Sequence, residues 1–245
     1  MAKAKTKLRL DQLLVELGLV ESRNRAQALI RAGKVLVSET IIDKPGTKIK
    51  IDAPIRVKES MQFVSRGGIK LEGAMKHFQI DCSNWICADL GASTGGFTDC
   101  LCQRNAGKIY AVDVGYGQLA WKLRQDSRVI VMERCNARHL QSLPEPIDFI
   151  VGDLSFISIS KIIDAMLRLA KPKAKGVLLI KPQFEVGPEG IKDGLVKDQK
   201  LREQAIQTVL EDFRQSGCTI LGHIPSPIAG AKKGNVEELV YVKFP

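Results

Sequence analysis

Four ionisable residues stand in short, unusual local patterns along this chain of 245 residues. They are Lys70, Asp153, Lys181 and Glu237, in the runs Ser-Arg-Gly-Gly-Ile-Lys, Gly-Asp-Leu-Ser-Phe, Leu-Ile-Lys-Pro and Gly-Asn-Val-Glu. A glycine-rich turn, Asp-Leu-Gly-Ala-Ser-Thr-Gly-Gly-Phe-Thr at residues 89–98, lies between the first and the second. Such a turn suits a nucleotide-like cofactor, and the dispersed Lys, Asp, Lys and Glu side chains suit removal of a proton from a hydroxyl. The pattern indicates group transfer onto a hydroxyl rather than hydride transfer.

The elements that must position these residues alternate along the chain. Strand-like runs are expected at residues 86–90, 108–112, 129–132, 149–151, 177–180, 219–221 and 239–242, and helices near 97–104, 116–124, 158–170 and 198–215. This alternation predicts an α/β fold, a doubly wound and mostly parallel sheet with helices on both faces. Ligands bind such sheets beyond the carboxyl ends of the strands. The residues at or just after the ends of these runs are Asp89, Asp113, Asp153 and Lys181.

The glycine-rich turn is the expected cofactor loop. Gly91, Gly95 and Gly96 allow the backbone to turn tightly and to approach a ligand closely. A glycine-rich loop alone equally indicates NAD binding or a structural turn. Asp113, 24 residues after Asp89, adds a carboxylate placed to bind the hydroxyls of a cofactor ribose. The candidate cofactor-binding residues are Asp89, Gly91, Ser93, Thr94, Gly95, Gly96, Phe97, Thr98 and Asp113.

Residues 1–60 form a separate basic segment. They contain 13 Lys and Arg against 7 Asp and Glu, a net charge of +6 within the +10 of the whole chain. The spacing of leucines predicts a first helix that ends at Gly18, and Ser22 is expected to cap a second helix that ends at Gly33. Short β-branched runs follow, so the segment is expected to be a small α+β unit. Its charge favours binding to a polyanion.

Four runs in this segment belong together. They are Arg-Leu-Asp-Gln-Leu-Leu at 9–14, Ser-Arg-Asn-Arg-Ala at 22–26, Ile-Arg-Ala-Gly-Lys-Val at 30–35 and Lys-Pro-Gly at 44–46. Over about residues 7–58 they resemble the S4-type RNA-binding domain, which implies a unit that grips structured RNA through its shape and phosphates. Guanidinium groups suit phosphate oxygens because they donate two hydrogen bonds at once. The implied RNA contacts are Arg23, Arg25, Arg31 and Lys34.

Five further runs cover the rest of the chain. They are Gly-Ala-Ser-Thr-Gly-Gly-Phe-Thr at 91–98, Val-Asp-Val-Gly-Tyr-Gly-Gln-Leu at 112–119, Gly-Asp-Leu-Ser-Phe-Ile-Ser at 152–158, Lys-Pro-Gln-Phe-Glu at 181–185 and Gly-Asn-Val-Glu at 234–237. They resemble the TlyA family, the S4-fronted members of the FtsJ-like (RrmJ-like) S-adenosylmethionine methyltransferases. The resemblance implies a class I, Rossmann-like methyltransferase domain over 61–245 behind an S4-type domain over 1–60. It also implies methylation of a cytidine ribose 2′-hydroxyl in ribosomal RNA, and the short form of this chain favours large-subunit RNA.

The resemblance makes Lys70, Asp153, Lys181 and Glu237 a catalytic tetrad. A lysine that removes a proton must be neutral, whereas free lysine has a pKa of about 10.4, which desolvation and a neighbouring ammonium lower. Lys181 is assigned as the base or the alkoxide stabiliser, with Lys70 favouring its neutral form and steadying the oxyanion. Asp153 is expected to orient Lys181, and Glu237 to hold Lys70 or the ribose. Glu238 stands beside Glu237, and only one of the two can face the site.

Other acceptors and functions fit the sequence less well. Methylation of exocyclic amines usually goes with Asn/Asp-Pro-Pro-aromatic, where this chain has Asp-Leu-Ser-Phe at 153–156, and methylation at pyrimidine carbon-5 needs a cysteine in the site. The glycines are spaced Gly-x-x-x-Gly-Gly, which disfavours a NAD-dependent oxidoreductase. A non-catalytic RNA-binding or ribosome-assembly factor remains the alternative. Phe97, Phe156 and Phe184 fit either stacking on a base or adenine, or packing in the core.

The composition is that of an ordinary globular protein, with 44% hydrophobic and 26% charged residues. The six cysteines show no Cys-x-x-Cys spacing, so they are expected to be reduced thiols of a cytoplasmic protein without a metal site. No apolar run approaches the roughly 20 residues that span a bilayer, and no signal peptide is expected, which disfavours a membrane-lysing protein. The expected partner is ribosomal RNA or a ribosomal subunit, with no membrane and no obligate protein partner.

Overall fold

The chain divides into two compact units, unit 1 (Met1–Met61) and unit 2 (Gln62–Pro245). The computed structural model describes residues 6–20, 22–57, 62–230 and 235–245. The domain boundary expected between residues 60 and 61 lies outside these described residues. Because each unit has a hydrophobic core of its own, each is described by itself.

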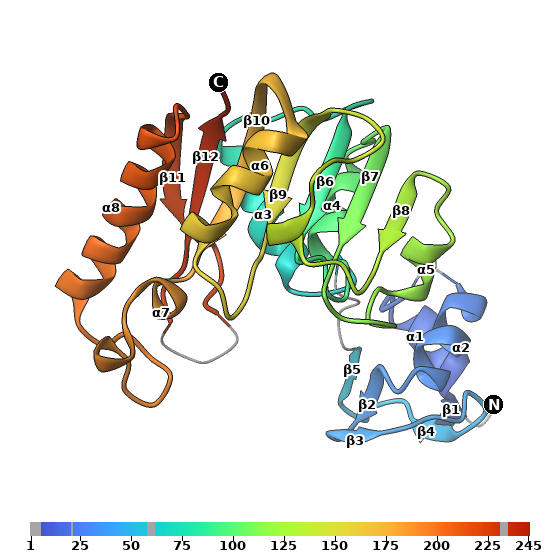
Figure 1. Cartoon of the computed structure of the whole chain (residues 1–245). Coiled ribbons are helices and arrows are strands. Elements are labelled where there is room, and N and C mark those ends of the chain that lie inside the picture. Colours follow the sequence, from blue (N-terminus) through green and yellow to red (C-terminus); the bar gives the residue numbers. More distant parts are fainter. Residues whose placement is uncertain (1–5, 21, 58–61, 231–234) are drawn as a thin grey trace. The chain divides into compact units, whose positions relative to one another are not determined.

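Unit 1 combines two helices with short strands (Figure 1). The helices are α1 (Leu10–Glu16) and α2 (Arg23–Arg31), and the strands are β1 (Lys7–Arg9), β2 (Val35–Val37), β3 (Thr40–Ile41), β4 (Lys48–Lys50) and β5 (Ile55–Val57). β1 pairs with β4, and β2 pairs with both β3 and β5, all antiparallel. Ser22 caps α2 as predicted, since its Oγ accepts a hydrogen bond from the Arg25 backbone N–H at 3.3 Å.

A seven-stranded sheet organises unit 2, in the order β11-β12-β10-β9-β6-β7-β8. Its strands are β6 (Ile86–Leu90), β7 (Lys108–Val112), β8 (Val129–Met132), β9 (Ile147–Gly152), β10 (Ala170–Ile180), β11 (Thr219–Pro225) and β12 (Glu238–Lys243). β12 runs antiparallel to β10 and β11, and the other neighbours pair parallel. From β6 the chain adds β7 and β8 toward one edge of the sheet. It then returns to place β9 on the other side of β6. The predicted doubly wound α/β fold is confirmed.

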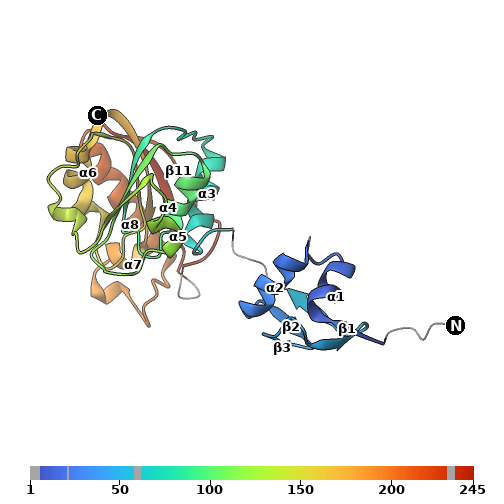
Figure 2. The same cartoon turned by 90° about the vertical axis from the view of Figure 1, so that its right-hand side faces the viewer.

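Helices cover both faces of this sheet (Figures 1 and 2). The helices of one face are α3 (Gly67–His77), α4 (Gly96–Gln103) and α5 (Trp121–Arg124); those of the other are α6 (Ile163–Leu169) and α8 (Gln199–Gln215). The short helix α7 (Pro182–Glu185) and the 3-10 turns η1 (Ala137–His139), η2 (Ile159–Ile162) and η3 (Pro188–Gly190) complete the connections. The sheet therefore lies between two apolar layers, which leaves its edges as the places for polar side chains.

Two expected helices differ from the observed ones. The helix expected near 116–124 is reduced to α5, because Gly117 takes a left-handed φ of 73° that a continuous right-handed helix excludes. The helix expected near 158–170 begins as the 3-10 turn η2 and becomes α-helical only at Ile163. Both differences lie close to the carboxyl ends of strands, where the chain bends around the candidate site.

All six cysteines are free thiols, five of them buried and Cys135 half-buried. Within the described ranges, no helix has both the length and the apolar character that crossing a membrane requires.

Candidate active site

The register of the sheet brings the candidate residues at its strand ends to one edge. Leu90, the last residue of β6, pairs with both Val112 and Gly152, the last residues of β7 and β9. Ile180, the last residue of β10, pairs with Glu238, the first residue of the antiparallel β12. The residues that follow β6, β7, β9 and β10 therefore share one edge with the residue that precedes β12.

The four predicted tetrad residues meet at this edge as two lysine–carboxylate ion pairs. Lys70 Nζ lies 2.5 Å from Glu237 Oε2, and both side chains are buried. Lys181 Nζ lies 2.5 Å from Asp153 Oδ1 and donates a hydrogen bond to Ser155 Oγ at 2.8 Å. All four side chains line one cavity of about 200 Å³, together with the glycine-rich loop.

Close contact between two helix starts places Lys70 in this cavity. Lys70 lies in the first turn of α3, next to the start of α4. A Cβ on Gly96 would overlap Ser65 Oγ, and a Cβ on Gly68 would overlap the ring of Phe63. Packing therefore requires Gly68 and Gly96. A side chain at Gly96 would push the start of α3 away from the loop, and one at Gly68 would displace Phe63.

Each of the two lysines has a carboxylate that compensates its charge. Buried charges persist in proteins when they are paired, and each lysine here has one carboxylate as its direct partner. Lys70 is thus held by Glu237, as one of the two expected roles of Glu237 requires, and Lys181 is held by Asp153. Two positive side chains line the same cavity, which suits it to an oxygen that becomes negative during reaction.

Glu237 and its neighbour Glu238 point in different directions. Glu237 is buried against Lys70, and a Cβ on Gly230 would lie 2.6 Å from its Oε1. Glu238 Oε2 instead lies 3.3 Å from Nδ1 of His223 on the adjacent strand β11. Since successive residues of an extended chain face opposite sides, the structure brings Glu237 to the cavity and not Glu238.

A second cavity of about 470 Å³ adjoins the first. The residues shared by the two cavities are Gly91, Ser93, Asp153 and Ser155. Asp113 lies in the wall of the larger one, where its Oδ2 accepts the backbone N–H of Ser93 at 2.8 Å and its Oδ1 that of Gly115 at 2.6 Å. A carboxylate oxygen has a second lone pair, so this fixed group can still accept hydrogen bonds from ribose hydroxyls. Leu154 and Ile157 give the same cavity an apolar wall.

The backbone of the loop explains its glycines. Gly91 has a φ of 83°, and a Cβ there would lie 3.2 Å from the backbone oxygen of Asp153. Gly95 has a φ of 94°, and a Cβ there would overlap Leu123 of α5. Ser93 and Thr94 stand exposed at the top of the loop and line the cavities. The residues present fit an adenosyl cofactor: an elongated double cavity, a close backbone and a fixed carboxylate for the ribose.

Asp89 and Thr98 lie behind the loop and do not line either cavity. Both are fully buried, and Thr98 Oγ1 donates a hydrogen bond to Asp89 Oδ2 at 2.6 Å. Burial raises the pKa of Asp89 to about 7, and its Oδ1 has no hydrogen-bond partner among the described residues. Their hydrogen bond joins β6 to α4 directly behind the cofactor loop, which gives these two residues a position that supports the loop. Phe97 lines the smaller cavity but is only 3% exposed and packs in the core.

Sequence reasoning assigned no role to most of a third cavity of about 360 Å³, which Lys181 and Glu237 also line. Phe156 and Phe184 line it with ring centroids 5.2 Å apart. Phe156 is 91% exposed and has a φ of 64°, a left-handed conformation that is strained for a bulky residue. Strain of this kind is found where function holds it in place. Of the two interpretations open for the phenylalanines, stacking fits Phe156 and core packing fits Phe97.

Polar groups of this third cavity were also unassigned. Gln183 Oε1 is buried and has no hydrogen-bond partner among the described residues, and Asn235 Nδ2 donates to the Gly194 carbonyl oxygen at 3.1 Å. Ser155 binds Lys181, as described above. All three residues stand in the runs that marked the tetrad, and proximity to Lys181 and Glu237 was the available signal.

The four predicted RNA contacts are all exposed in unit 1. Arg23, Arg25 and Arg31 belong to α2, and Lys34 follows it. Arg23 is the one that also forms an ion pair within the described residues, with Asp11 at 3.1 Å. Their exposure leaves these side chains accessible to a polyanion.

Comparison with known proteins agrees with both units. Residues 63–244 match the FtsJ-like methyltransferase family and residues 8–55 match the S4 domain. The chain is 41% identical to the 16S/23S rRNA (cytidine-2′-O)-methyltransferase TlyA of Mycobacterium tuberculosis, over 96% of this chain and 89% of that protein. A candidate hemolysin from Streptococcus thermophilus has a solved structure that is 40% identical, with a TM-score of 0.74 over 98% of this chain and 90% of that one.

A more distant structure shares the fold alone. It is the N-methyltransferase NodS from Bradyrhizobium japonicum in complex with S-adenosyl-L-homocysteine, which is 14% identical with a TM-score of 0.52, over 72% of this chain and 88% of that one. The resemblance predicted from the motifs is confirmed by these similarities.

Proposed function

Because the chain belongs to the FtsJ-like methyltransferase family, we propose that it transfers a methyl group from S-adenosylmethionine to the 2′-hydroxyl of a cytidine in ribosomal RNA. The observation that carries this proposal is the meeting of Lys70, Asp153, Lys181 and Glu237 around one cavity beside the cofactor loop. The name of the M. tuberculosis relative supports the substrate. Large-subunit RNA is the proposed target, and the name of that relative includes 23S as well as 16S RNA. Such a substrate assigns the reaction to the cytoplasm.

The double cavity would hold the cofactor. Asp113 would bind the ribose hydroxyls, and Leu154 and Ile157 would contact the adenine. Bound there, S-adenosylmethionine supplies a methyl group on a positively charged sulfur, which leaves as a neutral thioether. The loop at Gly91 would let the backbone approach the ligand, since no side chain intervenes.

Lys181 would act on the acceptor hydroxyl. It lines both the cavity beside the cofactor loop and the third cavity, here called the aromatic cavity because Phe156 and Phe184 line it. Its amine can therefore contact an oxygen presented between the two. As the oxygen–carbon bond forms and the carbon–sulfur bond breaks, the hydroxyl proton has to leave. A neutral Lys181 amine would accept this proton, whereas a protonated Lys181 would stabilise the alkoxide while the proton passes to water. Asp153 and Ser155 would orient the amine, and Lys70, held by Glu237, would add a second positive charge.

The aromatic cavity would receive the base of the acceptor nucleotide. Phe156 presents an exposed ring beside Phe184, and stacking of a base on an aromatic ring contributes about 1–3 kcal/mol. Gln183 Oε1 lacks a donor among the described residues, and the exocyclic amine of cytosine is a donor. These two features support an acceptor base that carries an exocyclic amine, as cytosine does.

Mapping of 2′-O-methyl groups in 16S and 23S ribosomal RNA tests this proposal. RNA is compared from cells with the gene, without it, and with a Lys181→Ala copy of it. At least one cytidine is expected to lose its 2′-O-methyl group both without the gene and with the variant. An unchanged map would contradict the proposal, and a ribosome-assembly defect with that unchanged map would favour the non-catalytic alternative.

A further inference from the structure

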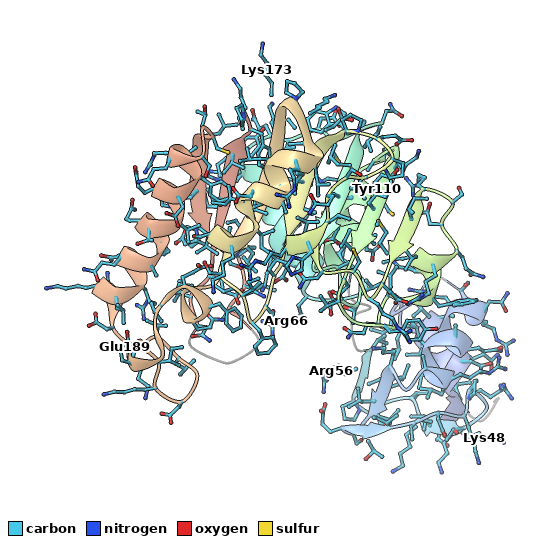
Figure 3. The ribbon with its side chains drawn as sticks, in the orientation of Figure 1. Lys48, Arg56, Arg66, Tyr110, Lys173 and Glu189 are labelled. Atoms are coloured by element: carbon cyan, nitrogen blue, oxygen red, sulfur yellow. The ribbon has the colours of Figure 1, made fainter. Side chains whose placement is uncertain are left out.

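The smaller sheet of unit 1 carries a row of cations on one face. In the antiparallel pair of β1 and β4, Lys7 is opposite Lys50 and Arg9 is opposite Lys48. All four side chains are exposed, whereas the residue between them on each strand is half-buried. Residues two apart on a strand share a face, so the four cations share the outward face of this two-stranded ribbon. Lys48 lies at the outer rim of unit 1 (Figure 3). We call these four residues the cationic ribbon.

This register does not favour the folding of unit 1 by itself. Like charges directly opposite each other destabilise an antiparallel pair, with side chains about 5 Å apart across the ribbon and about 7 Å apart along each strand. Within the described part of the chain, Lys7, Lys48 and Lys50 take part in no ion pair. The positive charges of these three lysines are therefore directed outward without neutralisation, which indicates an anionic partner.

A buried carboxylate connects the ribbon to helix α2. Asp11 is fully buried and accepts hydrogen bonds from Arg9 Nε at 3.0 Å and Nη2 at 3.1 Å, from Arg23 Nη2 at 3.1 Å and from Gln27 Nε2 at 3.0 Å. Hydrogen bonds from Arg9 above all hold the pKa of Asp11 well below its ordinary value. The side chains of Arg9 and Arg23 nevertheless remain 46% and 52% exposed. One carboxylate thus fixes two guanidinium groups that still face solvent.

We propose that the cationic ribbon and Arg23 form one phosphate-binding surface for a strand of structured RNA, with Asp11 as the positioning residue that holds Arg9 and Arg23. The proposal rests on the RNA substrate proposed above and adds a second contact surface to the exposed face of α2. Evenly spaced cations without aromatic side chains among them suit a chain of phosphates better than a protein partner, whose interface would be enriched in aromatic residues. Guanidinium groups that are already fixed lose less freedom when they bind phosphate.

Removing charge from the ribbon tests the surface itself. Full-length Lys48→Gln/Lys50→Gln is compared with Lys173→Gln/Lys200→Gln, which removes the same charge from exposed lysines of unit 2. Binding to a 23S ribosomal RNA transcript is measured over a range of salt concentrations. The ribbon variant is expected to bind more weakly and to flatten the log–log salt dependence by up to about 2 units, roughly 0.9 per phosphate contact. Equal RNA binding by the two double variants would overturn the proposal that the cationic ribbon binds RNA.

Replacing Asp11 tests the positioning role, because the expected change in RNA affinity is opposite to the change that net charge alone predicts. Asp11→Asn removes a negative charge from an RNA-binding unit, which by itself would strengthen binding. Loss of the fixed guanidinium groups is expected instead to weaken RNA binding by about tenfold. In an Arg9→Gln/Arg23→Gln background, Asp11→Asn should cause no further loss. Unchanged or stronger binding by Asp11→Asn in the otherwise unaltered chain would overturn the positioning role.

Two controls separate this surface from other failures. Thermal unfolding of Asp11→Asn shows whether unit 1 is folded, and if it is not, the Lys48→Gln/Lys50→Gln variant, which leaves Asp11 and both arginines in place, still decides the surface. Normal RNA binding by this ribbon variant, with normal methyl transfer by the unaltered protein, would remove the surface and leave the proposed function intact. An unaltered protein that neither binds nor methylates ribosomal RNA would remove the proposed function instead.

Discussion

The charged side chains in the site of unit 2 form ion pairs. Lys70 and Lys181 each contact one carboxylate, and Lys181 also contacts Ser155. Removal of one partner from a buried pair leaves the other charge uncompensated, which is strongly destabilising. Substitutions at Asp153 or Glu237 therefore mix effects on stability with effects on chemistry. Residues of the cavity walls give cleaner tests, and so does Lys181, because its partner Asp153 is 24% exposed and water can compensate the charge that remains.

Lys181→Ala is expected to lower methyl transfer by roughly a hundredfold or more, the contribution of a general base, with little change in cofactor affinity. Lys181→Arg should fail as well, because a guanidinium stays protonated. Single-turnover transfer to RNA measures the first effect, and calorimetric titration with S-adenosylhomocysteine measures the second. Lys192→Ala, at an exposed lysine, is the control. Substantial turnover by the Arg variant would restrict Lys181 to stabilising or positioning the oxygen.

Asp113→Ala is expected to weaken cofactor binding severely. The variant loses the acceptor for the ribose hydroxyls, and the backbone N–H groups of Ser93 and Gly115 lose the carboxylate that fixes the loop. Calorimetric titration with S-adenosylmethionine measures the effect, and Asp193→Ala, at an exposed aspartate, is the control. Normal affinity in Asp113→Ala would contradict this assignment, as would tight binding of NAD without binding of S-adenosylmethionine.

Phe156→Ala is expected to lower kcat/KM for RNA by a factor that corresponds to about 1–3 kcal/mol, the contribution of stacking on a base. Because the ring is 91% exposed, its removal should leave the thermal unfolding temperature unchanged. Phe156→Trp should restore much of the activity, since it preserves an aromatic face. An Ala variant with normal kcat/KM would show that this ring does not contact the substrate.

At the scale of elements, strand ends and helix starts place the site. β6, β7, β9 and β10 end at the edge where β12 begins, and the starts of α3 and α4 pack against each other through glycines. Asp89 and Thr98 connect β6 to α4 directly behind the cofactor loop. This connection is made by an ionisable group in a fully buried position, so it introduces a dependence on pH.

Stability of unit 2 is expected to fall as pH rises through the pKa of Asp89. Burial raises this pKa to about 7 from an ordinary 3.8, so the folded state favours the neutral acid. The contribution to stability is complete below about pH 4 and is lost as pH rises through about 7. Asp89→Asn is neutral at every pH and should match the unaltered protein at pH 4, while exceeding it at pH 8.5 by up to about 4 kcal/mol.

Denaturant unfolding at these two pH values measures the difference. Asp148→Asn, at a carboxylate that is already ion-paired near the start of β9, is the control for removing a charge. The same pH dependence in Asp89→Asn and in the unaltered protein would assign the effect to other groups.

At the scale of the whole molecule, binding and chemistry reside in different units. Unit 1 holds the exposed arginines of α2 and the cationic ribbon, and unit 2 holds the cavities. Each unit has its own core, so one can be altered while the other stays folded.

Removal of residues 1–61 is therefore expected to abolish methyl transfer to RNA and to leave cofactor binding largely unchanged. The physical reason is that RNA grip raises the local concentration of one ribose at the site. Transfer to ribosomal RNA and calorimetric cofactor binding are measured on the same preparation. An isolated unit 2 that methylates at the full-length rate would contradict this division.

The local sequence pattern determined several strands of this protein and the residues of its site. Apolar runs predicted β6, β7 and β8 at their observed bounds, because these strands are mostly apolar segments between polar turns. β10 begins at Ala170 rather than at residue 177. Its first half is rich in lysine, and its pairing with β9 holds Ala170 and then Lys175 on either side of an irregular stretch. Motifs also identified the residues that meet at the sheet edge.

Tertiary structure alone decided which groups became partners. Lys70 meets Glu237 across 167 positions of sequence, because strand order and an antiparallel last strand bring α3 and β12 together. Asp89 stands near the end of an apolar run as Asp113 does, yet it lies behind the loop, because β6 continues to Leu90 whereas Asp113 follows the end of β7 at Val112. The exposure of Phe156 likewise depends on a left-handed turn between two elements. Sequence spacing specifies elements and their ends, whereas contacts between distant segments follow from how those elements pack.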